Sequence, residues 1–297
     1  MKTHRTEEIR RLIVFGGMAL LGFALRPAAL AGEAAATVTA DHPAGVLEFE
    51  TQSEYSRIRI RKRGDVRTLL FVRDNGYEAV QSQLDLREPQ VPRFDYMKFF
   101  AASFLLVPRP KAVLIVGLGG GGMVHFLRRV SPDLQIDAVE IDPVVARLAE
   151  QYFGVRPDGR TRIIVGDGLK YLAETQNRYD VIYLDAYLKP SAETDAEGAP
   201  RSLRTQQFYK SVQSKLSPHG LVAFNLNNHS GLVDDIRNIV ATFPQIYAFP
   251  LAGEAVVLGS TDAARVSAGE FERRADELDR TEVPFMNFRE LLLRLHR

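Results

Sequence analysis

The sequence predicts an α/β protein in which a small antiparallel β domain precedes a Rossmann-like sheet. Short segments with a period near two fill the region from Val46 to Ser82, the pattern of strands with one buried face. From Lys111 onward, continuous apolar strands alternate with amphipathic helices. That alternation is typical of a mainly parallel sheet covered on both faces.

The first 31 residues differ in kind from the rest of the chain. A basic, polar start leads into the 14-residue apolar run Leu12–Leu25 and then into small residues that include Ala29-Leu30-Ala31. This is the order of a secretory signal with its cleavage site. The alternative, a buried N-terminal helix, fits Arg26-Pro27 poorly.

We therefore predict a signal peptide or membrane anchor over residues 1–31, and a linker over 32–45. If the segment is kept, residues 12–25 are the membrane tether, although a spanning helix needs roughly 20 residues. The expected location is periplasmic or secreted, or membrane-anchored, rather than cytoplasmic.

The predicted N-terminal β domain covers residues 46–90. Its strands are expected at "VLEFE", "SRIRIRK", "RTLLFVR" and "YEAVQ". Asp74-Asn75-Gly76 predicts a hairpin turn, because Asn and Gly tolerate the positive φ that such turns require. An apolar helix over about 94–106 follows, closed by Pro108 and Pro110.

The Rossmann-like, nucleoside-binding catalytic domain is predicted over residues 91–297. Five expected strands are "AVLIVG", "LQIDAVEID", "TRIIVGD", "YDVIYLDAY" and "GLVAFNL", each followed by a helical segment. "QIYAFPL" and "EAVVLGS" predict a closing antiparallel pair, and "FMNFRELLLRLHR" predicts a packing helix.

Composition excludes several classes of function. A net charge of +1 gives no basic field for nucleic acid. The chain has no cysteine, and its six histidines show no metal-ligand spacing. We therefore expect neither a nucleic-acid partner nor a bound metal.

The glycine-rich turn predicts a nucleoside site. Gly117, Gly119 and Gly121 follow a strand and open a helix, so a ligand can approach the backbone and the free N–H groups of the helix start. A tight turn without a ligand is the alternative interpretation of such glycines. Their position between a strand and a helix favours the nucleoside site.

Acids at the next two strand ends strengthen this prediction. Glu140 in "AVEID" is placed to accept both ribose hydroxyls, whereas Asp142, before Pro143, fits a helix cap. Asp167 in "VGDG", followed by Gly168, is expected to meet the adenine amino group, with a second helix cap as its alternative. The set favours an adenosyl ligand in a class I adenosylmethionine-dependent fold, and a nicotinamide dinucleotide is the other option.

From Val46 to about Ser260, the chain resembles the spermidine synthase (polyamine aminopropyltransferase) family. The resemblance rests on "SEYSRIRI", "VQS", "VLIVGLGGG", "VEIDP", "GDG", "YDVIYLDAY" and "LRTQQFYKSVQSKLSPHGLVAFN", in that order. Members place a β-sheet domain on a Rossmann-like domain and transfer an aminopropyl group to an amine. The resemblance thus implies polyamine biosynthesis, with decarboxylated S-adenosylmethionine or S-adenosylmethionine as co-substrate and no metal.

The resemblance also implies roles for particular residues. Asp185 in "YLDAY" falls on the family's catalytic Asp, and Tyr96 on a Tyr that lines the same cleft. A carboxylate there would orient the amine and accept its proton. Gln81 and Tyr187 are the expected substrate contacts. The implied partners are a small-molecule amine and a second copy of the chain in a homodimer.

Four positions depart from the family's pattern. Gly120 and Leu188 stand where the family carries acids, Ser56 replaces a Gln, and Lys98 lies near Tyr96 where acids are common. One carboxylate about 4 Å from an ammonium contributes on the order of 4 kcal/mol near a protein surface. We therefore expect weak polyamine recognition beside an intact nucleoside site. A non-catalytic or re-specialised nucleoside-binding protein and a methyltransferase stay as alternatives, and residues 188–200 are expected to form a lid.

Overall fold

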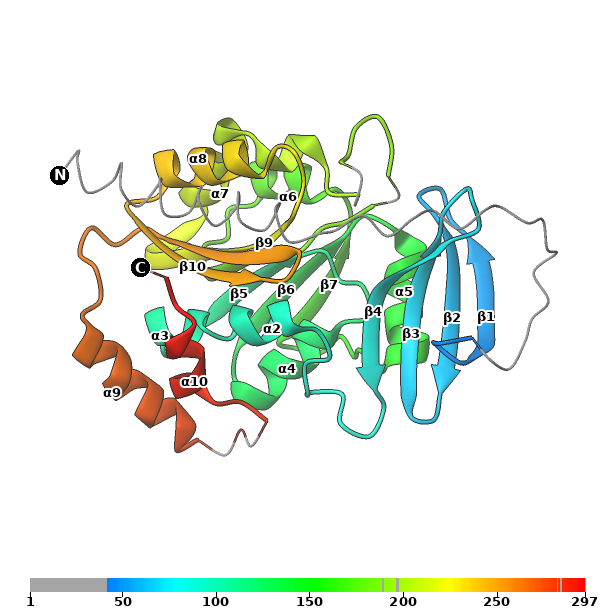
Figure 1. Cartoon of the computed structure of the whole chain (residues 1–297), viewed down its shortest axis with the longest axis horizontal. Coiled ribbons are helices and arrows are strands. Elements are labelled where there is room, and N and C mark those ends of the chain that lie inside the picture. The colour runs from blue at the N-terminus through cyan, green and yellow to red at the C-terminus, as the bar shows by residue number, and fades with distance from the viewer. Residues whose placement is uncertain (1–41, 189, 196–197, 282, 284, 297) are drawn as a thin grey trace.

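The protein folds around two β-sheets (Figure 1). The structure, a computed structural model, describes residues 42–296 except 189, 196–197, 282 and 284. The smaller sheet has four antiparallel strands in the order β1-β2-β3-β4, and the larger has seven in the order β10-β11-β9-β8-β5-β6-β7. The two-part α/β architecture predicted from the sequence is confirmed.

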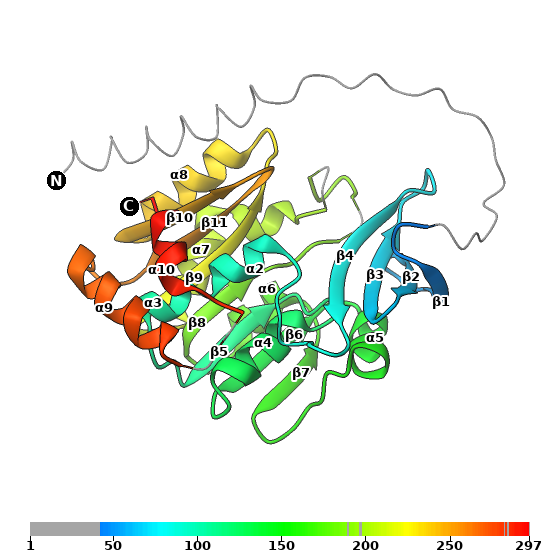
Figure 2. The same ribbon diagram turned by 60° about the horizontal axis from the view of Figure 1, so that its bottom comes forward.

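The small sheet consists of β1 (Val46–Gln52), β2 (Arg57–Arg63), β3 (Val66–Val72) and β4 (Glu78–Asp85). Apolar residues on one face, among them Ile58 and Phe71, pack against helix α5 (Pro143–Phe153) of the larger unit (Figure 2). On β2, Arg59 and Arg61 form ion pairs with Glu78. The alternation of the strands thus separates an apolar docking face from a paired ionic face.

The link between the sheets contains two short helices instead of the single helix predicted over about 94–106. Helix α2 spans Asp95–Phe100 and α3 spans Ser103–Leu106. The N–H of Ala101 is shared between the carbonyls of Met97 and Lys98, and Ala102 donates only three residues back, to Phe99. This tightening of the turn divides the helix, which periodicity does not reveal.

The large sheet is parallel at its centre and antiparallel at one edge. Its parallel strands are β5 (Ala112–Val116), β6 (Gln135–Glu140), β7 (Thr161–Val165), β8 (Tyr179–Leu184) and β9 (Leu216–Asn227). β11 (Glu254–Ser260) pairs antiparallel with β10 (Gln245–Leu251), as predicted, and on its other side with β9.

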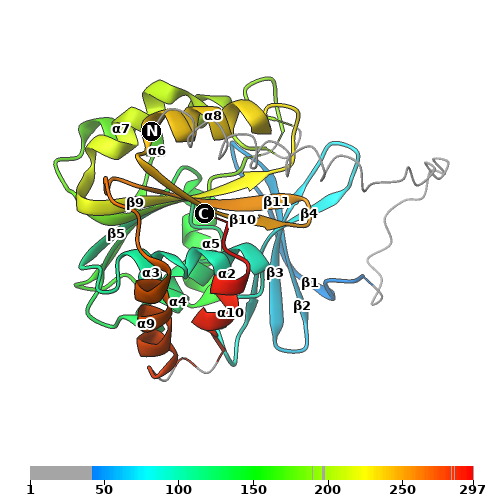
Figure 3. The same cartoon turned by 60° about the vertical axis from the view of Figure 1, so that its left-hand side comes forward.

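Helices cover both faces of this sheet (Figure 3). Helices α6 (Gly168–Glu174), α7 (Gln206–Ser214) and α8 (Leu232–Thr242) pack on one face. Helices α2, α3, α4 (Gly122–Val130), α9 (Ala268–Asp279) and α10 (Phe288–Leu293) pack on the other. Alternate residues of β9 supply the two cores, with Leu221 on one side and Val222 on the other.

The C-terminal region holds one helix that the sequence analysis missed. Helix α9 begins after Ser267, whose side chain accepts a hydrogen bond from the N–H of Glu270. This Ser-x-x-Glu spacing is a helix-start signature, so the signal was present. Helix α10 ends at Leu293 and is shorter than the predicted packing helix.

The predicted leader, tether and most of the linker lie outside the described residues. Within the part of the chain that the structure describes, no helix is long and apolar enough to cross a membrane. The same residues contain no cluster of three His, Asp or Glu side chains suited to a metal ion.

Candidate active site

A cleft of about 800 Å³ lies where the carboxyl ends of β5, β6, β7 and β8 face β4 and the start of β11. Open α/β sheets bind ligands at this edge. The cleft is lined by most of the residues predicted to bind nucleoside or substrate: Gln81, Tyr96, Gly117, Gly119, Glu140, Asp167, Gly168, Asp185 and Tyr187. Tertiary structure thus gathers the predicted set into one place.

The glycine loop between β5 and α4 is held by Glu140 at the end of β6. One carboxylate oxygen of Glu140 accepts from the N–H of Leu118 at 3.0 Å and from that of Gly119 at 3.4 Å. The other oxygen accepts from the N–H of Asp142 at 3.0 Å. Burial raises the pKa of Glu140 against the opposing effect of these backbone bonds. A carboxylate has about four acceptor positions, and three are taken here, so one remains, on the oxygen that accepts from Asp142, for a ribose hydroxyl.

Gly117 brings the loop close to the strand that carries Asp185. Its φ is +97°, and a Cβ there would lie 2.1 Å from the carbonyl oxygen of Asp185. Only glycine permits this approach. Gly119 and Gly121 also have positive φ. Gly121, however, faces Val155 and is not among the described residues that line the cleft.

Asp142 and Asp167 both act as helix caps. Asp142 accepts from the N–H of Val144 and also from Ser53, which ties the β domain to this edge of the sheet. Asp167 accepts from the N–H of Leu169 through one oxygen while its exposed side chain lines the cleft. The cap expected as its alternative is therefore present, and its contact with adenine stays a prediction.

Asp185, which follows β8, is a cleft acid whose two carboxylate oxygens are both held by side chains. The hydroxyl of Tyr96 donates to one carboxylate oxygen at 2.8 Å, and Asn225 Nδ2 donates to the other at 3.0 Å. Burial raises the pKa of Asp185 above its ordinary value, opposed by these two hydrogen bonds. A buried carboxylate with a raised pKa has the properties of a general base.

Asn225 on β9 was not among the predicted site residues. Its Nδ2 group holds Asp185, whereas its Oδ1 atom is buried and accepts no hydrogen bond from the described residues. The signal available in the sequence was its place at the end of a strand, in "NLNN". The two predicted substrate contacts also line the cleft: the Tyr187 hydroxyl donates to the Asn225 carbonyl, and Gln81 Nε2 donates to the Ala79 carbonyl.

The structure gives physical reasons for two of the departures from the family's pattern. A Cβ at Gly120 would lie 2.8 Å from Ser82 Oγ and 3.0 Å from Phe153 Cδ1. The space for an acid at this position is thus already filled. Ser56 is 1% exposed, within the turn between β1 and β2, and does not line the cleft as described.

The other two departures differ from one another. Leu188 lines the cleft, so an apolar side chain replaces an acid there. Lys98 forms an ion pair with Asp95 at 2.9 Å. Asp95 lines the cleft and Lys98 does not, so the positive charge at Lys98 is paired with an acid of the cleft wall.

Glu254, the first residue of β11, is a second acid that the sequence analysis missed. It lines the same cleft as Asp185. Burial and the negative charges of Asp185 and Asp95 raise its pKa to about 7. No motif marks this position, because its approach to Asp185 depends on how β11 pairs with β9.

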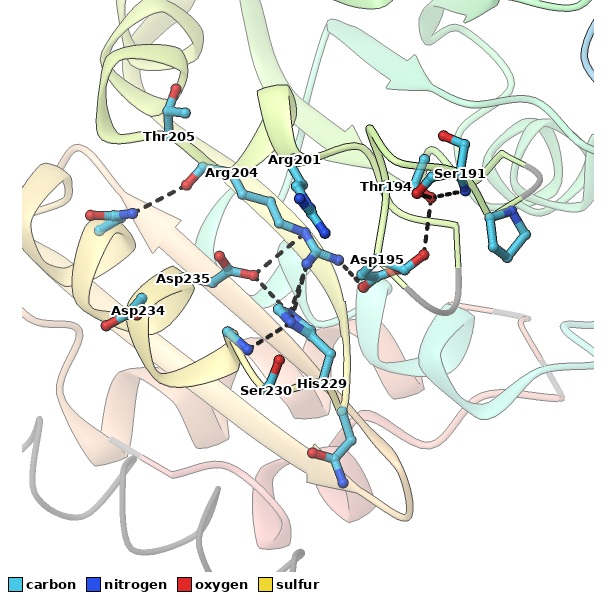
Figure 4. A pocket seen from close by; sticks show the side chains of 14 residues that line it. Ser191, Thr194, Asp195, Arg201, Arg204, Thr205, His229, Ser230, Asp234 and Asp235 are labelled. Atoms are coloured by element: carbon cyan, nitrogen blue, oxygen red, sulfur yellow. Dashed lines mark hydrogen bonds and ion pairs between the residues drawn. The ribbon is translucent and has the colours of Figure 1, made fainter.

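A second cavity of about 840 Å³ lies beyond the segment between β8 and α7 (Figure 4). Arg204 pairs there with Asp195 at 2.5 Å and with Asp235 at 3.5 Å, and His229 Nε2 lies 3.0 Å from Asp235. All four side chains are at most 13% exposed. This cluster, which we call the Arg204 cluster, fastens the predicted lid segment to the start of α8.

Ser191 and Thr194 line both the active-site cleft and the second cavity. The lid segment is therefore the wall between them. Its own bonds include Leu188 N–H to the Gly198 carbonyl. The lid function remains a prediction.

The strand order, the glycine loop at the first parallel strand and the acids at the following strand ends together define the fold class of adenosylmethionine-dependent transferases. Comparison with known proteins narrows this class. Residues 99–252 match the profile of the spermine/spermidine synthase domain. The chain belongs to the spermine/spermidine synthase family.

Proteins with similar sequences include aminopropyltransferases and methyltransferases. The chain is 33% identical to a polyamine aminopropyltransferase of Vibrio vulnificus over 211 residues, which cover 69% of this chain and 68% of that protein. It is 36% identical to the human eEF1A lysine and N-terminal methyltransferase over 158 residues, or 50% of this chain and 22% of that protein. Only a fraction of the longer methyltransferase is therefore represented here.

Solved structures show the same two resemblances. A probable spermidine synthase from Corynebacterium glutamicum superposes with a TM-score of 0.64 at 22% identity, covering 78% of this chain and 85% of that one. Human methyltransferase-like protein 13, solved in complex with SAH, superposes with a TM-score of 0.54 at 30% identity, covering 63% and 88%. The first likeness establishes the fold alone.

Proposed function

We propose that this protein transfers an alkyl group from the sulfonium of an adenosylmethionine-type donor to the nitrogen of an amine, with Asp185 as the base. The observation that carries the proposal is the fixed Asp185 carboxylate, which accepts from Tyr96 and Asn225. Its backbone carbonyl lies against Gly117. The acid therefore stands beside the loop that would hold the nucleoside.

The reaction needs a proton acceptor beside the attacking nitrogen, and it needs the sulfonium of the donor to be held facing that nitrogen. As the new N–C bond forms, the C–S bond breaks and the sulfonium becomes a neutral thioether. The attacking nitrogen gives up a proton, which the Asp185 carboxylate accepts. Glu140 and Asp167 would hold the ribose and adenine, so that the sulfur faces Asp185 across the glycine loop.

An aminopropyl group is the first candidate for the transferred group. Two relatives that align over more than two thirds of their own length both carry the name polyamine aminopropyltransferase. The polyamine of that name and the lysine and N-terminus of the methyltransferase's name are all amines. An amine acceptor is thus common to both groups of relatives, and a carboxylate base suits it.

A methyl group is the second candidate, and Gly120 is the observation that favours it. The donor's own ammonium would lose a carboxylate partner at this position, where Ser82 and Phe153 fill the space. The absence of this carboxylate therefore weakens the site's preference for binding a decarboxylated donor over S-adenosylmethionine. A relative at 30% identity was solved with SAH, the product that methyl transfer leaves.

One assay separates these candidates. The purified protein is incubated with an amine and each donor in turn, and the nucleoside product is identified by mass spectrometry. Methylthioadenosine indicates aminopropyl transfer, whereas S-adenosylhomocysteine indicates methyl transfer. Asp185→Asn should lower turnover by roughly 10²–10⁴-fold, and Asp133→Asn, on the exposed surface beside Arg160, is the matched control.

Two results would contradict the proposal. If Asp185→Asn keeps its turnover, Asp185 is not the base. Tight nucleoside binding without any product would instead indicate a non-catalytic nucleoside-binding protein built on this fold.

Location is a separate proposal that rests on the sequence of residues 1–31. We propose that the chain acts outside the cytoplasm or at a membrane surface, since the charged start, apolar run and Ala29-Leu30-Ala31 have the order of an export signal. The homodimer likewise remains a proposal.

A further inference from the structure

The ribose of a bound nucleoside carries a pair of hydroxyl groups, and Glu140 can accept a hydrogen bond from only one of them. Three of the roughly four acceptor positions of its carboxylate are taken by the backbone N–H groups of Leu118, Gly119 and Asp142. The position that remains is on the oxygen that accepts from Asp142. The second ribose hydroxyl therefore needs another partner.

The turn between β1 and β2 contributes one side chain to the wall of the cleft. Of residues 53–56, all of which the structure describes, only Tyr55 lines the cleft. Tyr55 is partly exposed, so a ligand can reach it. Its hydroxyl forms no hydrogen bond with the described residues, although a phenol can both donate and accept.

Tyr55 lies on the nucleoside side of the cleft. Burial raises the pKa of its hydroxyl, and the negative charges of Asp142, Asp167 and Glu140 raise it further, as does the charge of the preceding residue. Such an effect falls off with distance. The hydroxyl is therefore near the two acids that are predicted to hold the ribose and the adenine.

A chain of hydrogen bonds fixes Tyr55 relative to Glu140. The backbone N–H of Tyr55 donates to Ser53 Oγ at 3.1 Å, and Ser53 Oγ donates to Asp142 Oδ2 at 2.5 Å. The N–H of Asp142 in turn donates, at 3.0 Å, to the Glu140 oxygen that keeps a free acceptor position. The turn is thus held on the side of the cleft where the ribose would bind.

We propose that the Tyr55 hydroxyl binds the second ribose hydroxyl, so that the nucleoside is held between Glu140 of the large sheet and Tyr55 of the small sheet. Ser53 is a positioning residue, which acts through the backbone of Tyr55. This proposal rests on the nucleoside site of the proposed function and does not depend on which group is transferred.

Calorimetry with methylthioadenosine and with its 2′-deoxy and 3′-deoxy analogues tests this contact. Tyr55→Phe, which removes only the hydroxyl, should weaken methylthioadenosine binding about three- to tenfold, the effect of losing one hydrogen bond. The analogue that lacks the hydroxyl bound by Tyr55 should bind equally well to the wild type and to Tyr55→Phe. The other analogue should show the full loss.

Ser53→Ala tests the positioning role. It should also weaken methylthioadenosine binding, but by less in the Tyr55→Phe background, because the two changes act on the same contact. Ser53→Thr, which keeps a hydroxyl, should retain most of the affinity. Tyr152→Phe is the control, since it removes a phenol hydroxyl on α5 outside the residues that line the cleft. It should keep the affinity for all three nucleosides.

A loss in Tyr55→Phe that is equal for all three nucleosides would overturn the contact, as would the absence of any loss for methylthioadenosine. A wild type that binds none of the three nucleosides would overturn it as well. A melting temperature measured on each variant separates loss of the contact from loss of the fold. Failure of the proposed transfer looks different, because the differences in binding then persist while neither donor yields a product.

Discussion

Gly120 offers a direct test of how the β domain limits the donor site. The change is Gly120→Ala, which adds a single Cβ. That atom would lie 2.8 Å from Ser82 Oγ and 3.0 Å from Phe153 Cδ1. Ser82 Oγ is the end of a short side chain, but Phe153 is 1% exposed and packed in the core between α5 and the small sheet. The ring has little room to move.

Overpacking of this kind costs about 1–3 kcal/mol. For a protein of this size, each kcal/mol lowers the melting temperature by about 2–4 °C. We therefore expect Gly120→Ala to melt roughly 2–12 °C below the wild type, measured by differential scanning calorimetry. Gly159→Ala is the control, since a Cβ at Gly159 meets nothing within 4 Å.

Ser82→Ala in the Gly120→Ala background separates the two neighbours. It removes the hydroxyl oxygen nearest the new Cβ and leaves the Phe153 contact, so the double variant should recover part of the lost stability. The two changes should be non-additive, because they share a contact. If Gly120→Ala has the same melting temperature as the wild type, Ser82 and Phe153 leave space for a Cβ at this position. The argument that packing excludes an acid there would then be wrong.

Four further predictions concern the site, the lid segment and the leader. Glu140→Ala should weaken methylthioadenosine binding at least tenfold, since this acid holds the glycine loop, lines the cleft and is the predicted acceptor for the ribose; equal calorimetric affinity at an unchanged melting temperature would contradict this. Turnover should fall as the pH drops through the raised pKa of Asp185, because only its deprotonated form accepts a proton; an acid limb that is no higher than that of an ordinary aspartate would count against it. Arg204→Met removes the guanidinium that pairs with the two buried acids of the Arg204 cluster, and should destabilise the protein by about 3–5 kcal/mol in urea unfolding; a change below about 1 kcal/mol would show that the cluster is solvated. N-terminal sequencing of protein from its native host should find a mature chain beginning near Gly32, and an intact Met1 in a soluble cytoplasmic fraction would defeat the export proposal.

The sequence by itself determined the order of the strands and of most helices, and it predicted the glycine loop and the acids that line the sheet edge of the cleft. Strand and helix periods are local properties, as are helix caps such as Asp142-Pro143, and both appear in the structure where the pattern placed them. The proximity of the glycine loop and Glu140 could also be predicted, because the loop and the end of the next strand are close in sequence. Local patterns failed at Ala101-Ala102, where shared hydrogen bonds divide a helix.

Only the tertiary structure decided the acceptor side. Asn225 and Glu254 come from two strands distant in sequence from Asp185. Asn225 donates to Asp185, and Glu254 lines the same cleft, because β9 lies between β8 and β11. Strand order and register are properties of the whole sheet, so no local spacing encodes them. The significance of Gly120 was hidden for the same reason. Its missing side chain looks like a lost acid in the sequence, and becomes a packing constraint only when Ser82 of the β domain closes over it.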